Sequence, residues 1–298
     1  MEIRQLNTFA VIAKMGSFTQ AAETLGYAQS SVTTQIQLLE SELGTKLFER
    51  IGKSITLTTD GTRLLSYAQK ILKLSEEAKS IIGNTDVPKG TLTIGAPESL
   101  CVMRLPGIFK EFHQRCPGVE LIVKLDTSTK FKNMLRENII DVAVLIGCGN
   151  QDDDFVVDLQ FPEPMLLLVS SGHPFSSREN IGLKDIADQS LILTENGCPY
   201  RSAFENILAE ERIRPRSVLE TGSIQAIKQL TADGLGISLL PRIAVENEIS
   251  QGSLVNLDWT GPDLGMMTQV VYHKDKWISP AMRIFLNLVK KIKPEGLD

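Results

Sequence analysis

The side chains best able to catalyse a reaction or hold a metal are scattered along this chain of 298 residues. A structural zinc site needs closely spaced cysteines or histidines. The sequence has only three histidines, His113, His173 and His273, and four cysteines without CxxC spacing, Cys101, Cys116, Cys148 and Cys198. No histidine has a serine or cysteine nucleophile placed with it as in a catalytic triad. We therefore expect no metal, no cofactor and no enzymatic activity.

Two other stretches could suggest catalysis or nucleotide binding, but each has a simpler structural explanation. The polar run at residues 151–154, with three consecutive aspartates, is typical of a solvated loop rather than of acid and base catalysis. The glycines at 234 and 236 precede an apolar strand, whereas a nucleotide-binding Gly-x-Gly-x-x-Gly loop opens a helix. They indicate the end of a helix.

Amides and hydroxyls between residues 29 and 37 indicate a different chemistry, the recognition of bases in DNA. The apolar residues Val32, Ile36 and Leu39 recur at helical spacing, which places the polar residues on the other faces of one helix. Glutamine can bind an adenine edge with two hydrogen bonds, and a threonine methyl can contact thymine. A solvated polar face in a protein-binding module is the alternative. The candidate residues are Gln29, Ser30, Ser31, Thr33, Thr34, Gln35 and Gln37.

A shorter helix precedes the polar one. Ser17 and Gln20 form a Ser-x-x-Gln capping box in front of apolar residues at helical spacing, and Gly26 ends the helix. Two short helices separated by a glycine turn are a helix-turn-helix, so Ser17 is a further candidate for DNA contact. An amphipathic helix from Ile3 to Ala13 completes a cluster of three helices.

Residues 49–58 are typical of two short strands about a Gly-Lys-Ser turn, following Leu47 and Phe48, which we expect to close the small core. This pattern predicts the wing of a winged helix-turn-helix, whose residues touch the DNA backbone beside the major groove. Arg50 and Lys53 are suitably placed to contact phosphates.

The formal net charge of −5 excludes a protein that binds nucleic acid through bulk positive charge. The first sixty residues are not basic either, so DNA binding has to depend on the arrangement of the contacts. We therefore expect a single copy of the helix-turn-helix to bind DNA poorly, and a second copy to be needed.

A long helix with a narrow apolar seam is predicted from Asp60 to Gly83. About 25 residues at 1.5 Å per residue give a rod of roughly 37 Å, which is too long to pack on so small a core. We expect this helix to pair with a second copy, and residues 83–90 to end it and serve as a hinge.

From residue 90 onward, strand and helix periods alternate as in an α/β domain. Strands are expected at residues 92–94, 120–125, 141–146, 165–170, 191–194, 218–220, 237–240 and 268–273, and helices at 105–115, 131–137, 200–211, 223–233 and 280–292. The expected domains are a DNA-binding domain at 1–59, a linker at 60–89 and an α/β domain at 90–298. Its first subdomain takes in about 90–162 and 267–298, its second about 163–266, with hinges near Pro162 and Gly265.

Clefts in such domains lie at the carboxyl ends of strands, where helix N-termini point their N–H groups inward. Hydroxyls and exposed amides there, with Arg201 as one cation, favour a carboxylate or other anion as ligand. Serine and threonine before helices are alternatively plain N-caps. The candidate ligand-binding residues are Ser99, Leu100, Thr127, Ser128, Thr129, Gly197, Cys198, Tyr200, Arg201 and Ser223.

Cys198 also permits a redox interpretation. A cysteine at a helix start beside Arg201 could have a lowered pKa and react with oxidants. No second cysteine follows it to form a disulfide switch, and a small buried residue lining the cleft is the alternative.

With helix-turn-helix, long helix and α/β body in this order, the chain resembles a LysR-type transcriptional regulator over nearly its whole length. The N-terminal pattern that carries the likeness includes Leu6-x-x-Phe9, Gly16-Ser17-Phe18-x-x-Ala21-Ala22-x-x-Leu25, Gln29-x-x-Val32-x-x-Gln35-Ile36-x-x-Leu39-Glu40 and Leu43-Gly44-x-x-Leu47-Phe48-x-Arg50. The resemblance implies a homodimer through the long helix, usually two dimers in a homotetramer, and an effector domain similar to periplasmic binding proteins (type 2). It also implies promoter DNA with an interrupted palindrome as a partner. RNA polymerase is a further candidate partner.

The helix that would read DNA departs from the family pattern at two places. Many members carry Ser-Arg where this chain has Thr33-Thr34, and Ser-Gln-Pro where it has Ala28-Gln29-Ser30. Without the arginine, glutamine and methyl contacts predict an A·T-rich half-site.

Parts of the sequence would also suit two other functions. Residues 90–298 alone would suit a solute-binding or sensor protein, and an enzyme with an appended helical domain would need a nucleophile or metal set. No apolar run approaches the ~18 residues of a membrane span, and the N-terminus lacks the basic start of a signal peptide. We expect a cytoplasmic protein without a membrane partner.

Overall fold

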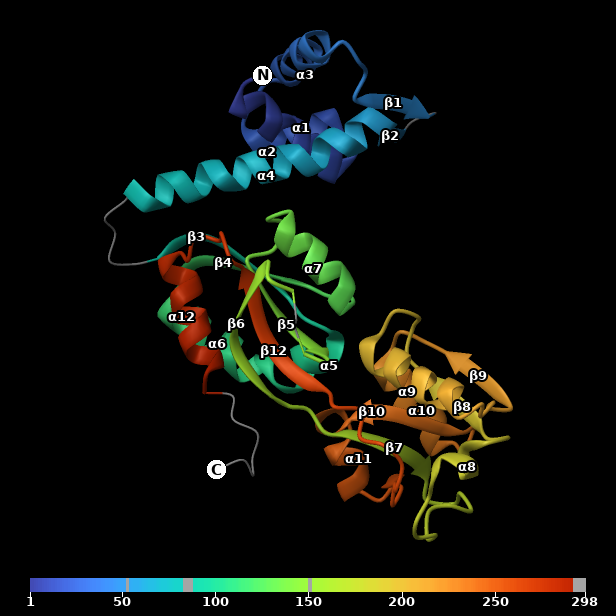
Figure 1. The fold of residues 1–298 in the computed structure, drawn as a ribbon. Coiled ribbons are helices and arrows are strands. Elements are labelled where there is room, and N and C mark those ends of the chain that lie inside the picture. The colour runs from blue at the N-terminus through green and yellow to red at the C-terminus, as the bar shows by residue number, and fades with distance from the viewer. Residues whose placement is uncertain (52–53, 83–87, 150–151, 292–298) are drawn as a thin grey trace. The chain divides into compact units, whose positions relative to one another are not determined.

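The computed structural model describes residues 1–51, 54–82, 88–149 and 152–291. The chain divides into two compact units, Met1–Asp86 and Val87–Asp298 (Figure 1). Among the described helices, none is long and apolar enough to span a bilayer.

The first unit is a winged helix-turn-helix followed by a long helix, as predicted. Helices α1 (Ile3–Met15), α2 (Phe18–Leu25) and α3 (Gln29–Leu43) pack around a core that includes Leu6, Phe9, Ile12, Val32 and Leu39. Gly26 ends α2 at a φ of 68°, a left-handed conformation that glycine adopts without the strain of a Cβ. This residue makes the tight turn into α3 possible.

Strands β1 (Phe48–Ile51) and β2 (Ser54–Leu57) form the antiparallel wing. The Phe48 ring lies 5.3 Å from the Phe9 ring and 5.6 Å from the Phe18 ring, centroid to centroid, which ties the wing to α1 and α2. The buried Glu40 of α3 accepts hydrogen bonds from Leu47 N at 2.9 Å and from Lys46 Nζ at 2.6 Å. The wing is therefore anchored to all three helices.

Helix α4 (Thr59–Ile82) packs its first half on α1 through the fully buried Ala68. Tyr67 and Leu74 of the same helix stay 62% and 63% exposed. Water-exposed side chains of this size, seven residues apart on one helix face, are typical of a surface that a second helix covers.

The second unit contains two five-stranded sheets (Figure 1). The first has the strand order β4-β3-β5-β12-β6 and is flanked by four helices. Its strands are β3 (Lys89–Gly95), β4 (Gly118–Lys124), β5 (Val142–Gly147), β6 (Phe155–Pro162) and β12 (Met267–His273), and its helices are α5 (Glu98–Met103), α6 (Leu105–Arg115), α7 (Ser128–Arg136) and α12 (Pro280–Val289).

The second sheet has the order β11-β7-β10-β8-β9. The parallel strands β10, β8 and β9 continue into loops and helices at their carboxyl ends, as α/β units do. The elements are β7 (Met165–Ser170), β8 (Ser190–Leu193), β9 (Ser217–Glu220), β10 (Ile237–Pro241), β11 (Leu254–Asn256), α8 (Leu183–Ile186), α9 (Pro199–Glu210), α10 (Ile224–Ala232), the 3-10 turn η1 (Arg242–Ala244) and α11 (Glu246–Ser250).

Sequence periodicity missed six of these elements, namely β6, β11, α5, α8, α11 and the 3-10 turn η1. The strand β6 is the most important, because it pairs along its whole length with β12 and carries the chain toward the second sheet. Its neighbours Asp152 and Asp154 lie in a partly exposed loop, as expected, and they also pair with Arg136 of α7. The strand β6 was not predicted, because it follows a polar run and pairs with β12, which comes more than 100 residues later in the chain.

The chain passes between the two sheets at Pro162 to Met165 and returns before Met267. The two passages lie side by side, since Glu163 N donates to Met266 O at 2.8 Å. The Glu163 carboxylate is buried there and accepts hydrogen bonds from Arg104 Nη2 at 3.0 Å and from Thr268 Oγ1 at 2.6 Å.

Replacing Glu163 with alanine is expected to destabilise the second unit by about 3 kcal/mol, because it leaves the largely buried Arg104 guanidinium without its counter-charge. Thermal unfolding followed by circular dichroism measures the loss. The matched control is Glu210→Ala, since Glu210 is exposed at the end of α9 and its loss should cost about 0.5 kcal/mol or less. Equal melting temperatures for the two variants would contradict this prediction.

Candidate functional site

The polar face of α3 is open to solvent in the first unit. Of the residues expected there, Thr33 and Gln35 are half-buried and the rest are exposed: Gln29, Ser30, Ser31, Thr34 and Gln37. The opposite face buries Val32, Ile36 and Leu39 completely or nearly so. Leu43, the last residue of this helix, is 39% exposed.

Several of these polar groups already have partners inside the unit. The hydroxyls of Thr33 and Thr34 donate to the carbonyls of Gln29 and Ser30, each at 2.9 Å. This leaves their methyl groups as the parts suited to contact another molecule.

Two other candidates have local structural roles. Gln35 accepts a hydrogen bond at 2.7 Å from the hydroxyl of Thr8, which is fully buried in α1. Ser17 caps α2 by accepting from Gln20 N at 3.3 Å, which is one half of the expected capping box. Gln29 and Gln37 are thus the amides best placed for outside contacts.

The expected phosphate contacts belong to the wing. Arg50 lies in β1, but the structure does not describe its side chain, and Lys53 lies outside the described residues.

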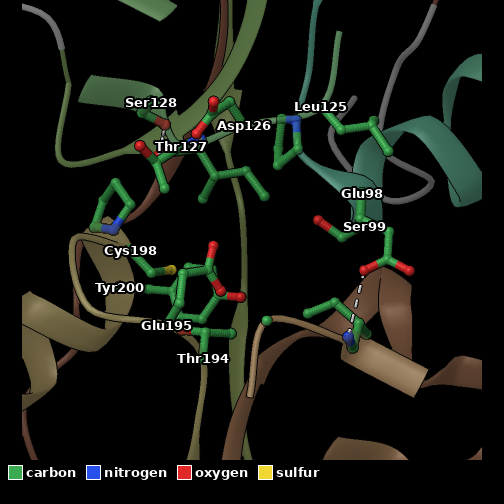
Figure 2. A pocket seen from close by; sticks show the side chains of 15 residues that line it. Glu98, Ser99, Leu125, Asp126, Thr127, Ser128, Thr194, Glu195, Cys198 and Tyr200 are labelled. Atoms are coloured by element: carbon green, nitrogen blue, oxygen red, sulfur yellow. Dashed lines mark hydrogen bonds between the residues drawn. The ribbon is translucent and has the colours of Figure 1, made fainter. Parts of the chain in front are cut away.

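A cavity of about 290 Å³ lies in the second unit where carboxyl ends of strands from both sheets meet. Residues 125–128 after β4 form one wall, and residues 194–200 after β8 face them (Figure 2). Ser128 Oγ donates to Ile146 O at 3.0 Å, and across the cavity Glu98 accepts from Ile224 N at 3.4 Å. This last bond joins α5 of the first sheet to α10 of the second.

Half of the ten expected ligand-binding residues line this cavity: Ser99, Thr127, Ser128, Cys198 and Tyr200. The other five are not among its lining residues: Leu100, Thr129, Gly197, Arg201 and Ser223. Leu100 belongs to the apolar core and is fully buried, and Ser223 caps α10 by accepting from Ala226 N.

The other ten lining residues were not among the expected ligand-binding residues: Pro97, Glu98, Leu125, Asp126, Ile146, Thr194, Glu195, Pro199, Gly222 and Ile224. All of them except Ile146 lie within three residues of an expected one. Extending each expected group along its loop, back to the end of the preceding strand, would have found these nine. Ile146 lies within β5 and carried no such signal.

The expectation that Arg201 offers a cation to the cleft is wrong. Its guanidinium is buried and donates to Glu220 at 2.7 Å, to Glu205 at 2.9 Å and to Thr194 O at 2.5 Å. The hydrogen bond from Arg201 holds the pKa of Glu220 below its usual value. Arg201 therefore braces α9 against β9, and a ligand anion has no arginine to pair with here.

The expected lowering of the Cys198 pKa is also wrong. Burial raises the pKa of its thiol, and burial raises the pKa of the neighbouring Tyr200 hydroxyl well above its usual value. A buried neutral thiol is a poor nucleophile toward peroxide, because the thiolate is the reactive form. Cys198 is better described as a small residue of the cavity wall.

At neutral pH, iodoacetamide is expected to modify the exposed Cys148 much faster than Cys198, whose raised pKa keeps it protonated. Peptide mass spectrometry after timed labelling measures both rates in one sample. Labelling in denaturant, where all thiols are equally accessible, is the control. Equal native rates would restore the redox interpretation.

Comparison with known proteins shows the same two parts. The bacterial regulatory helix-turn-helix family of the lysR type matches residues 3–62, and the LysR substrate binding domain matches residues 85–292. The uncharacterized HTH-type transcriptional regulator YwqM of Bacillus subtilis (strain 168) is 42% identical, with 98% of this chain and 99% of YwqM covered. The HTH-type transcriptional regulator GltR of the same organism is 34% identical, covering 96% and 95%.

Solved structures agree in fold. A full-length OxyR variant from Pseudomonas aeruginosa superimposes with a TM-score of 0.74 at 22% identity, covering 97% of this chain and 95% of OxyR. CbnR in complex with its target DNA gives a TM-score of 0.69 at 22% identity, covering 98% and 99%. With both domains matched in order and over its whole length, the chain belongs to the LysR family of transcriptional regulators, which bind DNA and respond to small-molecule effectors.

Proposed function

We propose that this regulator reads an A·T-rich promoter site through α3 and is switched by a small carboxylate bound in the cavity between residues 125–128 and 194–200. The observation that carries the first part is the solvent-exposed row of amides and hydroxyls on α3, opposite a fully packed face. Such a helix fits the major groove, where base edges carry the sequence information.

The DNA contacts follow from which α3 groups remain available. Gln29 and Gln37 offer exposed amides, and Thr33 and Thr34 offer methyl groups because their hydroxyls are bonded to the helix backbone. We propose that Arg50 and Lys53 of the wing, with Ser30 and Ser31, contact the DNA backbone. Gln35 and Ser17 act by holding α3 and α2 in place.

The dimer is proposed to form through α4. The exposed Tyr67 and Leu74 and the half-buried Ile71 supply an apolar strip that the single chain leaves open. Two copies of α3 would then reach two half-sites of an interrupted palindrome, with a tetramer as the assembly of two such dimers.

The division of the chain is part of the same proposal. Residues 1–59 bind DNA, 60–89 link and pair the copies, and 90–298 bind the effector, with subdomain I at about 90–162 and 267–298 and subdomain II at about 163–266. Bending at the passages near Pro162 and Gly265 would open and close the cavity between the sheets. The ligand acts through its different affinity for the open and closed arrangements.

We further propose that the chain has no enzymatic activity of its own and works in the cytoplasm, where a bacterial regulator meets promoter DNA and RNA polymerase. The relatives' names describe transcriptional regulators, and the cavity wall contains neither a histidine nor a described cluster of metal ligands.

The function is tested by a mobility shift with the promoter region upstream of the protein's own gene. We expect a retarded complex that survives excess unrelated DNA. The same preparation is assayed for turnover of candidate metabolites. Absence of a shift together with turnover would replace the proposed function with an enzymatic one.

Replacing Gln29 with alanine should weaken binding to the promoter fragment about tenfold or more, since one bidentate base contact contributes about 1–3 kcal/mol of discrimination. Binding to unrelated DNA of equal length should change little, and fluorescence anisotropy measures both affinities. Gln20→Ala, on the exposed side of α2, is the matched amide control. Equal losses on both DNAs would assign Gln29 to backbone contact.

A further inference from the structure

The cavity wall combines three carboxylates with no lysine, arginine or histidine among the described residues that line it. Its acidic residues are Glu98, Asp126 and Glu195. We infer that the effector is a small zwitterionic amino acid, with its ammonium group at Glu195 and its carboxylate at the N-terminus of α7. This inference rests on the proposed function, because it takes the cavity to be the effector site.

The three acidic residues differ in how far the protein itself satisfies them. Asp126 accepts from Thr127 N at 2.8 Å and pairs with Lys130 at 2.9 Å, and Glu98 accepts from Ile224 N at 3.4 Å. The side chain of Glu195 has no hydrogen bond or ion pair with the described part of the chain. Glu195 is therefore the acidic group that a ligand cation would neutralise.

A second and independent sign of a polar ligand is the hydroxyl of Thr194, the residue before Glu195. Thr194 is 3% exposed and lines the cavity, and its Oγ1 lies beside the Cys198 thiol and the Tyr200 hydroxyl but makes no hydrogen bond of normal geometry with them or with any other described residue. A buried hydroxyl without a partner costs about 1–3 kcal/mol, so a ligand that bonds to it is favoured. An ammonium group can bond to Thr194 and Glu195 together.

The carboxylate end of the ligand has a place on the opposite wall. Helix α7 begins at Ser128 with Thr127 as its N-cap, and no side chain caps it. Ser128 cannot cap it through its own hydroxyl, which donates to Ile146 O. The N–H groups of its first turn are suited to a carboxylate, and the helix dipole favours a negative charge there.

The other long helices at the cavity are less available to an anion. Ser223 caps α10, and the Glu98 carboxylate already approaches Ile224 N at the same helix end. Helix α9 has proline at its first position, so one of its N–H groups is absent. The geometry therefore separates a site for negative charge at α7 from a site for positive charge at Glu195.

The size of the cavity favours a small ligand, and the described residues around it do not form a metal-ion site. Its volume of about 290 Å³ lies at the lower end of small-molecule sites, about 300–1,000 Å³. The described residues contain no group of three or more His, Cys, Asp or Glu side chains that could hold a metal ion. A ligand with a carboxylate but no ammonium group would add negative charge to a cavity that Glu98, Asp126 and Glu195 already line, and would leave Glu195 without a counter-charge.

The inference is tested by measuring the melting temperature of the full-length protein with each standard L-amino acid. Two related compounds are measured for comparison with each one: the 2-oxo acid, which lacks the ammonium group, and the decarboxylated amine, which lacks the carboxylate. We expect at least one amino acid to raise the melting temperature, and its 2-oxo acid and amine to have little effect, because ligands stabilise the state they bind. If a 2-oxo acid raises the melting temperature as much as its amino acid does, the ammonium site at Glu195 is wrong, whereas the proposal of a carboxylate effector is retained. No response to any of these compounds would overturn both.

Calorimetry with the responding amino acid then tests the charge itself. Glu195→Gln should weaken binding about tenfold or more, since a hydrogen bond to a charged group contributes about 1.5–3 kcal/mol. The affinity of the Glu195→Gln variant for the 2-oxo acid should be equal to that of the parent protein or higher. Glu210→Gln, outside the cavity, is the matched control and should bind as the parent does. Unchanged affinity in Glu195→Gln would refute the ammonium site.

Discussion

The effector unit depends on one buried ionic contact at the place where the chain passes between its two sheets. Glu163 follows β6, and its carboxylate accepts hydrogen bonds from Thr268 of β12 and from Arg104 of the first sheet's helical layer. A buried carboxylate is tolerated only when its charge and hydrogen bonds are satisfied. These two passages therefore have to stay together, and the loops after β3 and β4 then face the loops after β8 across one cavity.

That constraint brings polar groups from both sheets to one cavity whose wall is otherwise largely apolar. Four helices begin around it, so backbone N–H groups point inward, while acidic side chains come from loops of both sheets. Some of the resulting charge is used internally, as in the bond from Ile224 N to Glu98 and the pairing of Arg201 with Glu220. What the protein leaves unsatisfied, at Thr194, Glu195 and the start of α7, defines the ligand that would fit.

The same distinction between satisfied and available groups applies to the DNA-binding unit. The hydroxyls of Thr33 and Thr34 are bonded to their own helix, and the Gln35 amide is bonded to Thr8. Recognition then falls to Gln29 and Gln37 and to methyl contacts, in a helix without arginine. This surface carries little positive charge, so one copy should bind DNA weakly. The apolar strip of α4 is therefore important, because pairing through it would bring two copies of α3 to the DNA.

Sequence periodicity located most of the fold, including α3, α4 and the strands at the centre of both sheets, because these elements bury a face at a regular period. It missed β6 and the short α5, since their pairing partners or packing surfaces come from distant parts of the chain. Loop positions at strand ends identified half of the expected ligand-binding residues on the cavity wall. Arg201 and Cys198 were misjudged because burial and pairing, which reverse the expected electrostatics, have no local signal.

The amino-acid sequence by itself determined the winged helix-turn-helix, the long apolar seam, the α/β body and the family, because these depend on patterns within neighbouring residues. Only the tertiary structure decided which polar groups are free to act. Glu220 neutralises Arg201 from nineteen residues away, Thr8 holds Gln35 from twenty-seven, and Ile224 meets Glu98 from 126. A charged group or an amide is available to a ligand only if no distant segment already pairs or hydrogen-bonds with it. Which groups are paired depends on how the chain packs in three dimensions.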